Sequence, residues 1–354
     1  MKRSSAATTA AASSGDAVGA AMRSCGRRLT MGGGYRRPDV PELPVLDYDA
    51  VLAAVDLAAA IDGVREAFVR HHAGEWEMPA KVYLPSPPFG DFRAMPARGG
   101  GLALVKWVTS FPGNPARGLP TVTGMICLSD AETGEPLMLL DARSVTALRT
   151  GAGAAVATRA LAAAGSRTVG LVGCGLHGAW TGRSLAAAGY AAGVCADPDA
   201  AAAERVAREL GWGTGRLPEA LACDVVCCVT PGAEPIIDAA DLRPGCHLNM
   251  LGADGPGKAE ATLDAVAACT LFCDEWEQAA HGGELTGAVR EGLVRRADVT
   301  ELGAVLAGDA PGRPGPESVT LFDSTGLAIQ DLAVAGAAYA AWRSGGVKAQ
   351  VVRL

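Results

Sequence analysis

Three glycines, Gly173, Gly175 and Gly178, have the spacing G-x-G-x-x-G and directly follow the short apolar run 168–172. In a turn between a strand and a helix, the first glycine permits the tight bend. The second lets backbone N–H groups approach a pyrophosphate, and the third lets the helix pack on the strand. The N-terminus of that helix then turns its positive end toward the phosphates. In a chain with 46 glycines the spacing alone would be weak, but the strand before it and an acid after it predict a dinucleotide-binding turn.

That acid is Asp197, which follows Gly178 by about 20 positions, where such a unit binds the ribose 2′-hydroxyl. A carboxylate there would repel a 2′-phosphate, so the sequence favours NAD(H) as cofactor over NADP(H). The alternative is a turn aspartate, because the Asp-Pro-Asp sequence at 197–199 is also good turn chemistry.

Three other charged residues suggest chemistry. Asp254 lies in a glycine-rich loop just past the apolar run 247–251, where an open α/β sheet binds its ligands; a capping aspartate is the alternative. Arg149 lies among Ala, Gly, Thr and Val, so its charge needs a partner, either a pyrophosphate or an intramolecular salt bridge. Lys106 lies between two apolar residues, and this local pattern on its own predicts a strand residue whose ammonium group extends into solvent.

Helical and extended patterns must position these residues. Before the glycine turn we expect a helix over 49–72, strands over 81–84, 103–108 and 122–128, and a long helix over 141–164. After it, short apolar runs alternate with helical stretches, which predicts an α/β domain of Rossmann type with a parallel sheet and helices on both faces. These later segments are 199–210, 224–229, 247–251, 260–268 and 271–273, then a strand over 319–322 and a helix over 326–342.

The composition narrows the class of protein. A chain of 354 residues suggests about two domains, and a net charge of −7 gives no reason to expect nucleic acid or an anionic membrane as partner. No run reaches the ~18 apolar residues that span a bilayer.

The ten cysteines form no C-x-x-C pair, so we expect small buried side chains in a reducing cytoplasm and no metal site. Residues 1–37, with seven basic residues and one acid, predict a disordered extension; a transit peptide or a later start at Met31 are the alternatives.

Five motifs extend the pattern over most of the chain: KWVTSFPGN at 106–114, GLPTVT at 118–123, LRTGA at 148–152, HLNMLGADGPGK at 247–258 and VTLFDSTG at 319–326. They resemble signatures of the ornithine cyclodeaminase/μ-crystallin family, which also includes an archaeal-type alanine dehydrogenase and ketimine reductases. The resemblance implies a homodimer. It also implies that an NAD(H)-binding Rossmann-like domain, 151–319, is inserted in an α+β substrate-binding and dimerisation domain made of 38–150 and 320–354.

The resemblance also assigns a substrate site. Lys81 takes a position where relatives often carry an arginine that grips the substrate carboxylate, and Lys106 matches the family's substrate-binding lysine, with a binding or catalytic task. Asp254 corresponds to the general acid/base that acts on the amine, or on water that attacks the imine. Lys258 would line the same cleft, with a solvated lysine as the alternative.

The expected cofactor site follows in the same way. Thr121 and Arg149 match positions that contact the cofactor, and Thr230 would touch the adenosine half. Ser324 and Thr325 would lie near the nicotinamide. His177 stands where relatives often carry glutamine; we expect it near the phosphates and assign it no catalytic role. The complete set is Thr121, Arg149, Gly173, Gly175, Leu176, His177, Gly178, Asp197, Thr230, Lys258, Ser324 and Thr325.

One position departs from the family's cyclodeaminases. Those that take ornithine or lysine carry an acidic residue two positions before a Met-Pro pair, suited to the substrate's distal ammonium, whereas this chain has Arg93 there. A cation would repel a diamino acid by about a few kcal/mol at close range in a low-dielectric site, and would suit a carboxylate. Arg93 is therefore a candidate substrate-binding residue, although Asp91 or Asp130 could supply the missing negative charge.

Three functions follow as hypotheses. The first is an NAD(H)-dependent amino-acid dehydrogenase or imine reductase, in which a hydride moves between the α-carbon and the nicotinamide while Asp254 shuttles the proton. The second is an ornithine- or lysine-type cyclodeaminase, a lyase that uses NAD catalytically and releases ammonia. The third is a non-enzymatic, crystallin-like NAD(P)H-binding protein, against which the retained Asp254, Lys106 and Arg149 argue.

Overall fold

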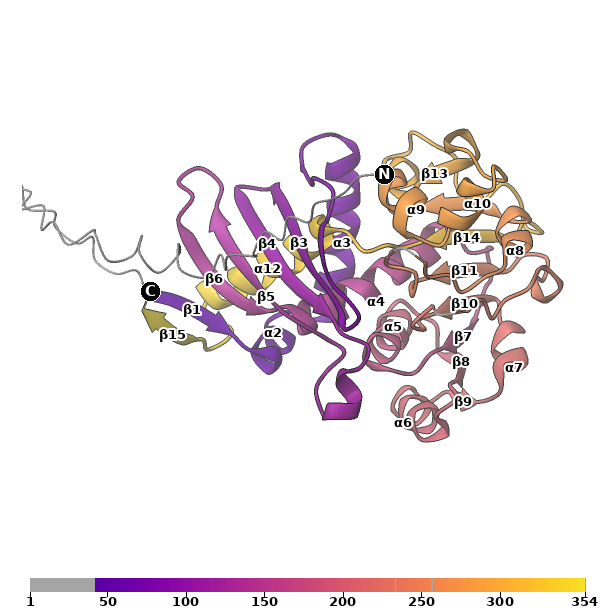
Figure 1. Cartoon of the computed structure of the whole chain (residues 1–354), viewed down its shortest axis with the longest axis horizontal. Coiled ribbons are helices and arrows are strands. Elements are labelled where there is room, and N and C mark those ends of the chain that lie inside the picture. Colours follow the sequence, from indigo (N-terminus) through magenta and orange to yellow (C-terminus); the bar gives the residue numbers. More distant parts are fainter. Residues whose placement is uncertain (1–41, 233, 256, 354) are drawn as a thin grey trace, which may run out of the picture. The chain divides into compact units, whose positions relative to one another are not determined.

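The computed structural model describes residues 42–232, 234–255 and 257–353. They belong to one compact unit that contains two β-sheets (Figure 1). The extension expected over 1–37 lies outside the described residues.

The first sheet has the strand order β15-β1-β6-β5-β4-β3-β2 within the described residues. Strands β2 to β6 pair antiparallel in succession, β1 joins β6 in parallel, and β15 joins β1 antiparallel. Side chains alternate along β4, so Lys106 lies on the buried face whereas its neighbours Val105 and Trp107 lie on the exposed face. The strands are β1 (Glu42–Leu46), β2 (Val82–Ser86), β3 (Gly90–Gly99), β4 (Leu102–Ser110), β5 (Val122–Asp130), β6 (Pro136–Asp141) and β15 (Gln350–Arg353).

Helices α2 (Tyr48–Ala54) and α3 (Leu57–His72) replace the single helix that we expected over 49–72. That expectation was wrong in the middle, because Val55 is extended and the Asp56 side chain accepts a hydrogen bond from Ala59 N, which starts a new helix. Hydrophobic periodicity continues across the break and therefore conceals it.

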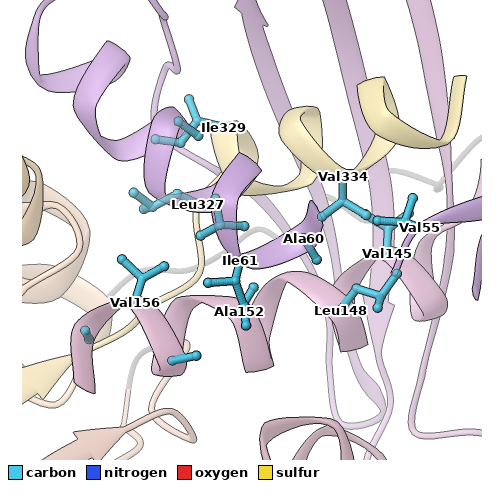
Figure 2. Packing of buried hydrophobic residues seen from close by; sticks show 14 of the residues in the cluster. Val55, Ala60, Ile61, Val145, Leu148, Ala152, Val156, Leu327, Ile329 and Val334 are labelled. Carbon is cyan, nitrogen blue, oxygen red and sulfur yellow. The ribbon is translucent and has the colours of Figure 1, made fainter. Parts of the chain in front are cut away.

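The chain has two halves, one around each sheet. The core of the half with the first sheet lies between α3, α4 (Ala142–Leu161) and α12 (Ala328–Arg343), and α12 packs directly on β3 and β4. Figure 2 shows Ile61 of α3 near Ala152 of α4, and Val334 of α12 near Val145 of α4. Small residues let these helices approach closely, and the apolar area that they bury stabilises the fold by about 25 cal/mol per Å².

Helix α4 also packs on α5 (Leu176–Ala187) of the second half. A Cβ atom at Gly151 would lie 2.5 Å from the Trp180 carbonyl oxygen, so this contact requires glycine. Helix α4 thus fixes Arg149, two residues earlier, between the two halves.

The second sheet is parallel, with the order β13-β12-β14-β11-β10-β7-β8-β9 in the described residues, which confirms the Rossmann-type prediction. Strand β14 lies between β12 and β11, so the sheet reaches Asp323 instead of ending at 319. All four β14 residues are buried, as is typical of a central strand in a parallel sheet that is covered on both faces. The remaining elements are β7 (Thr168–Val172), β8 (Ala192–Ala196), α6 (Ala200–Leu210), β9 (Gly213–Thr214), α7 (Leu217–Leu221), β10 (Val225–Cys228), β11 (His247–Met250), α8 (Leu263–Ala267), β12 (Thr270–Cys273), α9 (Trp276–Gly282), α10 (Thr286–Arg290), β13 (Val299–Glu301), α11 (Leu302–Ala307) and β14 (Thr320–Asp323), with 3-10 turns η1 (Asn114–Arg117), η2 (Ala239–Asp241) and η3 (Arg296–Asp298).

None of the helices in the described part of the chain combines the length and the apolar composition that a membrane span needs. The cysteines of this part of the chain are free, and no group of three or more His, Cys, Asp or Glu side chains there is arranged to hold a metal ion.

Candidate active site

A cavity opens between β3 and β4 of the first sheet and the carboxyl ends of β11 and β14 of the second. The crevice past the carboxyl ends of parallel strands is where α/β folds bind ligands. Apolar and hydroxyl side chains complete its wall, among them Met95, Val108, Thr146 and Thr150. Of the residues predicted for the site, those that line the cavity are Lys81, Arg93, Lys106, Arg149, His177, Asp254, Ser324 and Thr325.

Lys106 is 1% exposed and points inward, so the solvent-reaching interpretation was wrong. Its Nζ donates to Asp331 Oδ1 at 3.0 Å, and Arg149 Nε lies 3.6 Å from the same oxygen. Burial lowers the pKa of Lys106 to about 8, against the opposing effect of Asp331. Lys106 is therefore mostly an ammonium at neutral pH.

Arg93 connects the two sheets across the cavity. Its Nε lies 2.6 Å from Asp91 Oδ1 and its Nη1 lies 2.8 Å from Asp254 Oδ2. Lys258 Nζ binds the other Asp254 oxygen at 2.5 Å. Burial opposes ionisation of Asp254, but the charges of Arg93 and Lys258 outweigh it and hold the pKa of Asp254 well below its usual range. Asp254 is thus a carboxylate in this state.

Asp91 and Asp130 were the candidates to supply the negative charge that cyclodeaminases use to bind a distal ammonium. Both carboxylates already have partners within the chain. Asp91 is paired with Arg93. Asp130 accepts hydrogen bonds from Glu132 N and Thr133 N of its own exposed turn.

Lys81 approaches the cavity from the segment before β2. Its Nζ donates to the Thr325 carbonyl oxygen at 2.6 Å, and burial lowers its pKa to about 8. Asp274 holds the segment that contains Thr325, because it accepts hydrogen bonds from Thr325 Oγ1 at 3.1 Å and Gly326 N at 2.8 Å. Burial raises the pKa of Asp274 to about 6.

The glycine turn fits a dinucleotide. Gly173 has φ of 95°, and a Cβ atom at Gly178 would lie 1.9 Å from the Gly173 carbonyl oxygen, so both positions require glycine. No side chain caps the N-terminus of α5, which begins at the exposed Leu176 after its N-cap Gly175, so first-turn N–H groups are available for a phosphate.

Asp197 follows β8 and lies beside this turn. Its Oδ2 accepts from Cys174 N at 2.7 Å and its Oδ1 accepts from Asp199 N at 2.8 Å. These two hydrogen bonds hold the carboxylate at the end of β8, beside the glycine turn. The ribose contact of Asp197 stays a prediction.

The other expected cofactor contacts occupy three places. His177 lies in the first turn of α5, where burial and the nearby Arg149 lower its pKa to about 4, so the imidazole is neutral at pH 7. Thr230 follows β10 and donates its hydroxyl to Glu260 Oε1 at 2.7 Å. Thr121 precedes β5, and its carbonyl accepts from Phe111 N.

The sequence model of the ornithine cyclodeaminase/mu-crystallin family matches residues 44–346. The chain belongs to this family.

Family members of stated activity are similar over most of their length. The alanine dehydrogenase of Archaeoglobus fulgidus is 40% identical over 305 residues, which cover 84% of this chain and 94% of the relative. The iminosuccinate reductase of Paracoccus denitrificans is 34% identical over 263 residues, covering 68% and 77%. A solved archaeal alanine dehydrogenase dimer with bound NAD superimposes with a TM-score of 0.85 at 37% identity, covering 89% of this chain and all of that one.

Family motifs predicted the cations of the cavity but not three buried carboxylates, of which Asp331 pairs with two of the cations and the others, Asp274 and Glu260, bind groups of the surrounding loops. Asp331 is the acid among small apolar residues of α12, the same signal that singled out Arg149. Asp274 directly follows β12, at the carboxyl end of a parallel strand, as Asp254 follows β11. Glu260, which binds Thr230, had no comparable signal.

Proposed function

We propose that this protein is an NAD(H)-dependent oxidoreductase that moves a hydride between the nicotinamide and the α-carbon of an amino acid or its imine. The observation that carries the proposal is one cavity that combines two ammonium groups, Lys81 and Lys106, with the carboxylate of Asp254. The uncapped turn of α5 supports the cofactor assignment. The alanine dehydrogenase and iminosuccinate reductase relatives support the reaction class.

The cations would hold the substrate. Lys81 and Lys106, both mostly protonated at neutral pH, would bind the α-carboxylate with charge-assisted hydrogen bonds. Arg93 lines the same cavity and would bind the same group or a second carboxylate. These contacts would fix the position of the α-carbon for hydride transfer.

NAD(H), when bound, supplies the hydride acceptor or donor. In the oxidative direction the electron pair of the Cα–H bond leaves with the hydrogen as hydride, and the nitrogen lone pair forms the C=N bond. Asp254 accepts the proton that nitrogen must lose before its lone pair is available. Water then adds to the imine, and the products are a 2-oxo acid and ammonium.

Substrate binding would also adjust Asp254. In the structure Arg93 and Lys258 hold its pKa low, which makes it a weak base. A substrate carboxylate beside Arg93 and Lys81 adds negative charge to the site and raises the pKa of Asp254 toward a useful range.

A panel of substrates tests the proposal. Small 2-oxo acids with ammonia and NADH should give net loss of nicotinamide absorbance, and the matching amino acids with NAD should give net gain. Ornithine and lysine, assayed in parallel for ammonia release, test the cyclodeaminase. Ammonia from ornithine without a net change in NADH would overturn the proposed reaction.

We also infer a homodimer, with the exposed face of the first sheet as interface. Val105 of β4 and Met125 of β5 are 43% and 56% exposed, and Trp107 lies directly opposite Met125. An apolar face of this kind is typical of an interface between subunits. Helix α12 packs on the opposite face of this sheet, within its own chain. The dimeric archaeal alanine dehydrogenase supports the dimeric state.

A further inference from the structure

One buried carboxylate, which lies behind the cavity wall, is paired with two cations that line the cavity. Asp331 Oδ1 accepts from Lys106 Nζ at 3.0 Å and lies 3.6 Å from Arg149 Nε. Lys106 and Arg149 both line the cavity, whereas Asp331 is 0% exposed and lies behind them. Two positive charges therefore share one negative charge.

The surroundings of Asp331 show that this position is specific. It lies in the first turn of α12, where the helix N-terminus stabilises negative charge. Its Oδ2 and Arg149 Nε are buried without hydrogen-bond partners in the structure. Gly326 leaves room for the guanidinium, because a Cβ atom there would lie 2.3 Å from Arg149 Nη1.

We propose that Asp331 is a positioning residue that holds Lys106 and Arg149 side by side and leaves one positive charge to face an anionic group of the substrate. The choice of a carboxylate substrate rests on the proposed function. Asp331 itself does not touch the cavity and acts through the two cations.

The charges around Lys106 set the expected pH dependence. Asp331 on α12 favours its ammonium form, whereas Arg149 on α4 and Arg93 on β3 oppose it, and His177 on α5 is neutral. Since burial already lowers the pKa of Lys106 to about 8, loss of Asp331 would lower it further, by about one to three units. Carboxylate binding would then weaken at neutral pH.

Asp331→Asn tests this proposal because it keeps the shape and removes the charge. The expected result is a shift of the alkaline limb of kcat/KM toward acid by about one to three units, with KM for the 2-oxo acid raised more than kcat is lowered. Asp331→Glu should restore the limb. The control is Asp224→Asn, which removes a carboxylate that binds Thr168 at the amino end of β7, away from the cavity at the carboxyl ends of the strands, and should leave the profile unchanged. An unchanged limb in a folded Asp331→Asn protein would refute the proposal.

A second variant and a binding measurement test the proposal without relying on the folding of Asp331→Asn or on turnover. Lys106→Arg cannot lose its proton in this range, so only the titration of Lys81, whose pKa is also about 8, should remain in the alkaline limb, which should become less steep. A limb as steep as that of the wild type would overturn the proposal even if Asp331→Asn does not fold. Calorimetric titration of the NADH-loaded protein with pyruvate should show the same acid shift in Asp331→Asn. Wild-type protein without turnover on any acid would refute the proposed function, whereas wild-type turnover with an Asp331→Asn profile like its own would refute only this inference.

Discussion

At the scale of single residues, the proposed reaction depends on the carboxylate of Asp254. Asp254→Asn keeps the size of the side chain and a hydrogen bond to Arg93 but cannot accept a proton. Positioned acid–base groups contribute about 10²- to 10⁴-fold, so kcat should fall by about that factor while NADH still binds. Stopped-flow turnover and a fluorescence titration measure the two quantities. Asp130→Asn, in an exposed turn, is the matched control and should have full activity.

Arg93 should decide between substrate classes. Arg93→Glu would place a carboxylate where the cation now lies between Asp91 and Asp254, which would attract a distal ammonium and repel an acid. We expect relative activity on ornithine to rise and activity on small neutral or acidic 2-oxo acids to fall. Arg93→Gln separates loss of the cation from gain of the acid. Ornithine turnover no higher with glutamate than with glutamine would show that this position does not select the substrate.

At the scale of elements, the turn between β7 and α5 should select the cofactor through its neighbour Asp197. We expect NADH to bind at least about tenfold more tightly than NADPH, a difference of ~1.4 kcal/mol. Asp197→Asn removes the charge but keeps an oxygen for Cys174 N, so NADPH binding should improve while the turn survives. Trp180 on α5 offers a fluorescence signal for the titrations. Equal wild-type affinities would mean that the carboxylate does not face the 2′ position.

Sequence patterns predicted elements well where the local signal and the tertiary role agree. The parallel sheet followed from alternating apolar runs, and the glycine turn followed from spacing. The break at Asp56 was missed because periodicity runs through it, and the central place of β14 was missed because pairing between distant segments leaves no local mark. Lys106 was misjudged on its own for the same reason. Its direction depends on the register of β4, and its partner Asp331 is 225 residues away.

At the scale of the whole molecule, the exposed face of the first sheet should hold two copies together. In a two-fold interface each substitution appears twice, so Val105→Lys with Met125→Lys would bring four like charges to one apolar contact. We expect wild-type protein to be dimeric at micromolar concentration in light scattering and the double variant to be monomeric. Leu293→Lys is the matched control, because Leu293 is 51% exposed but belongs to the half with the parallel sheet, and it should remain dimeric. A monomeric wild-type protein would contradict the inferred dimer. A double variant that still dimerises would show that the interface lies elsewhere on the molecule.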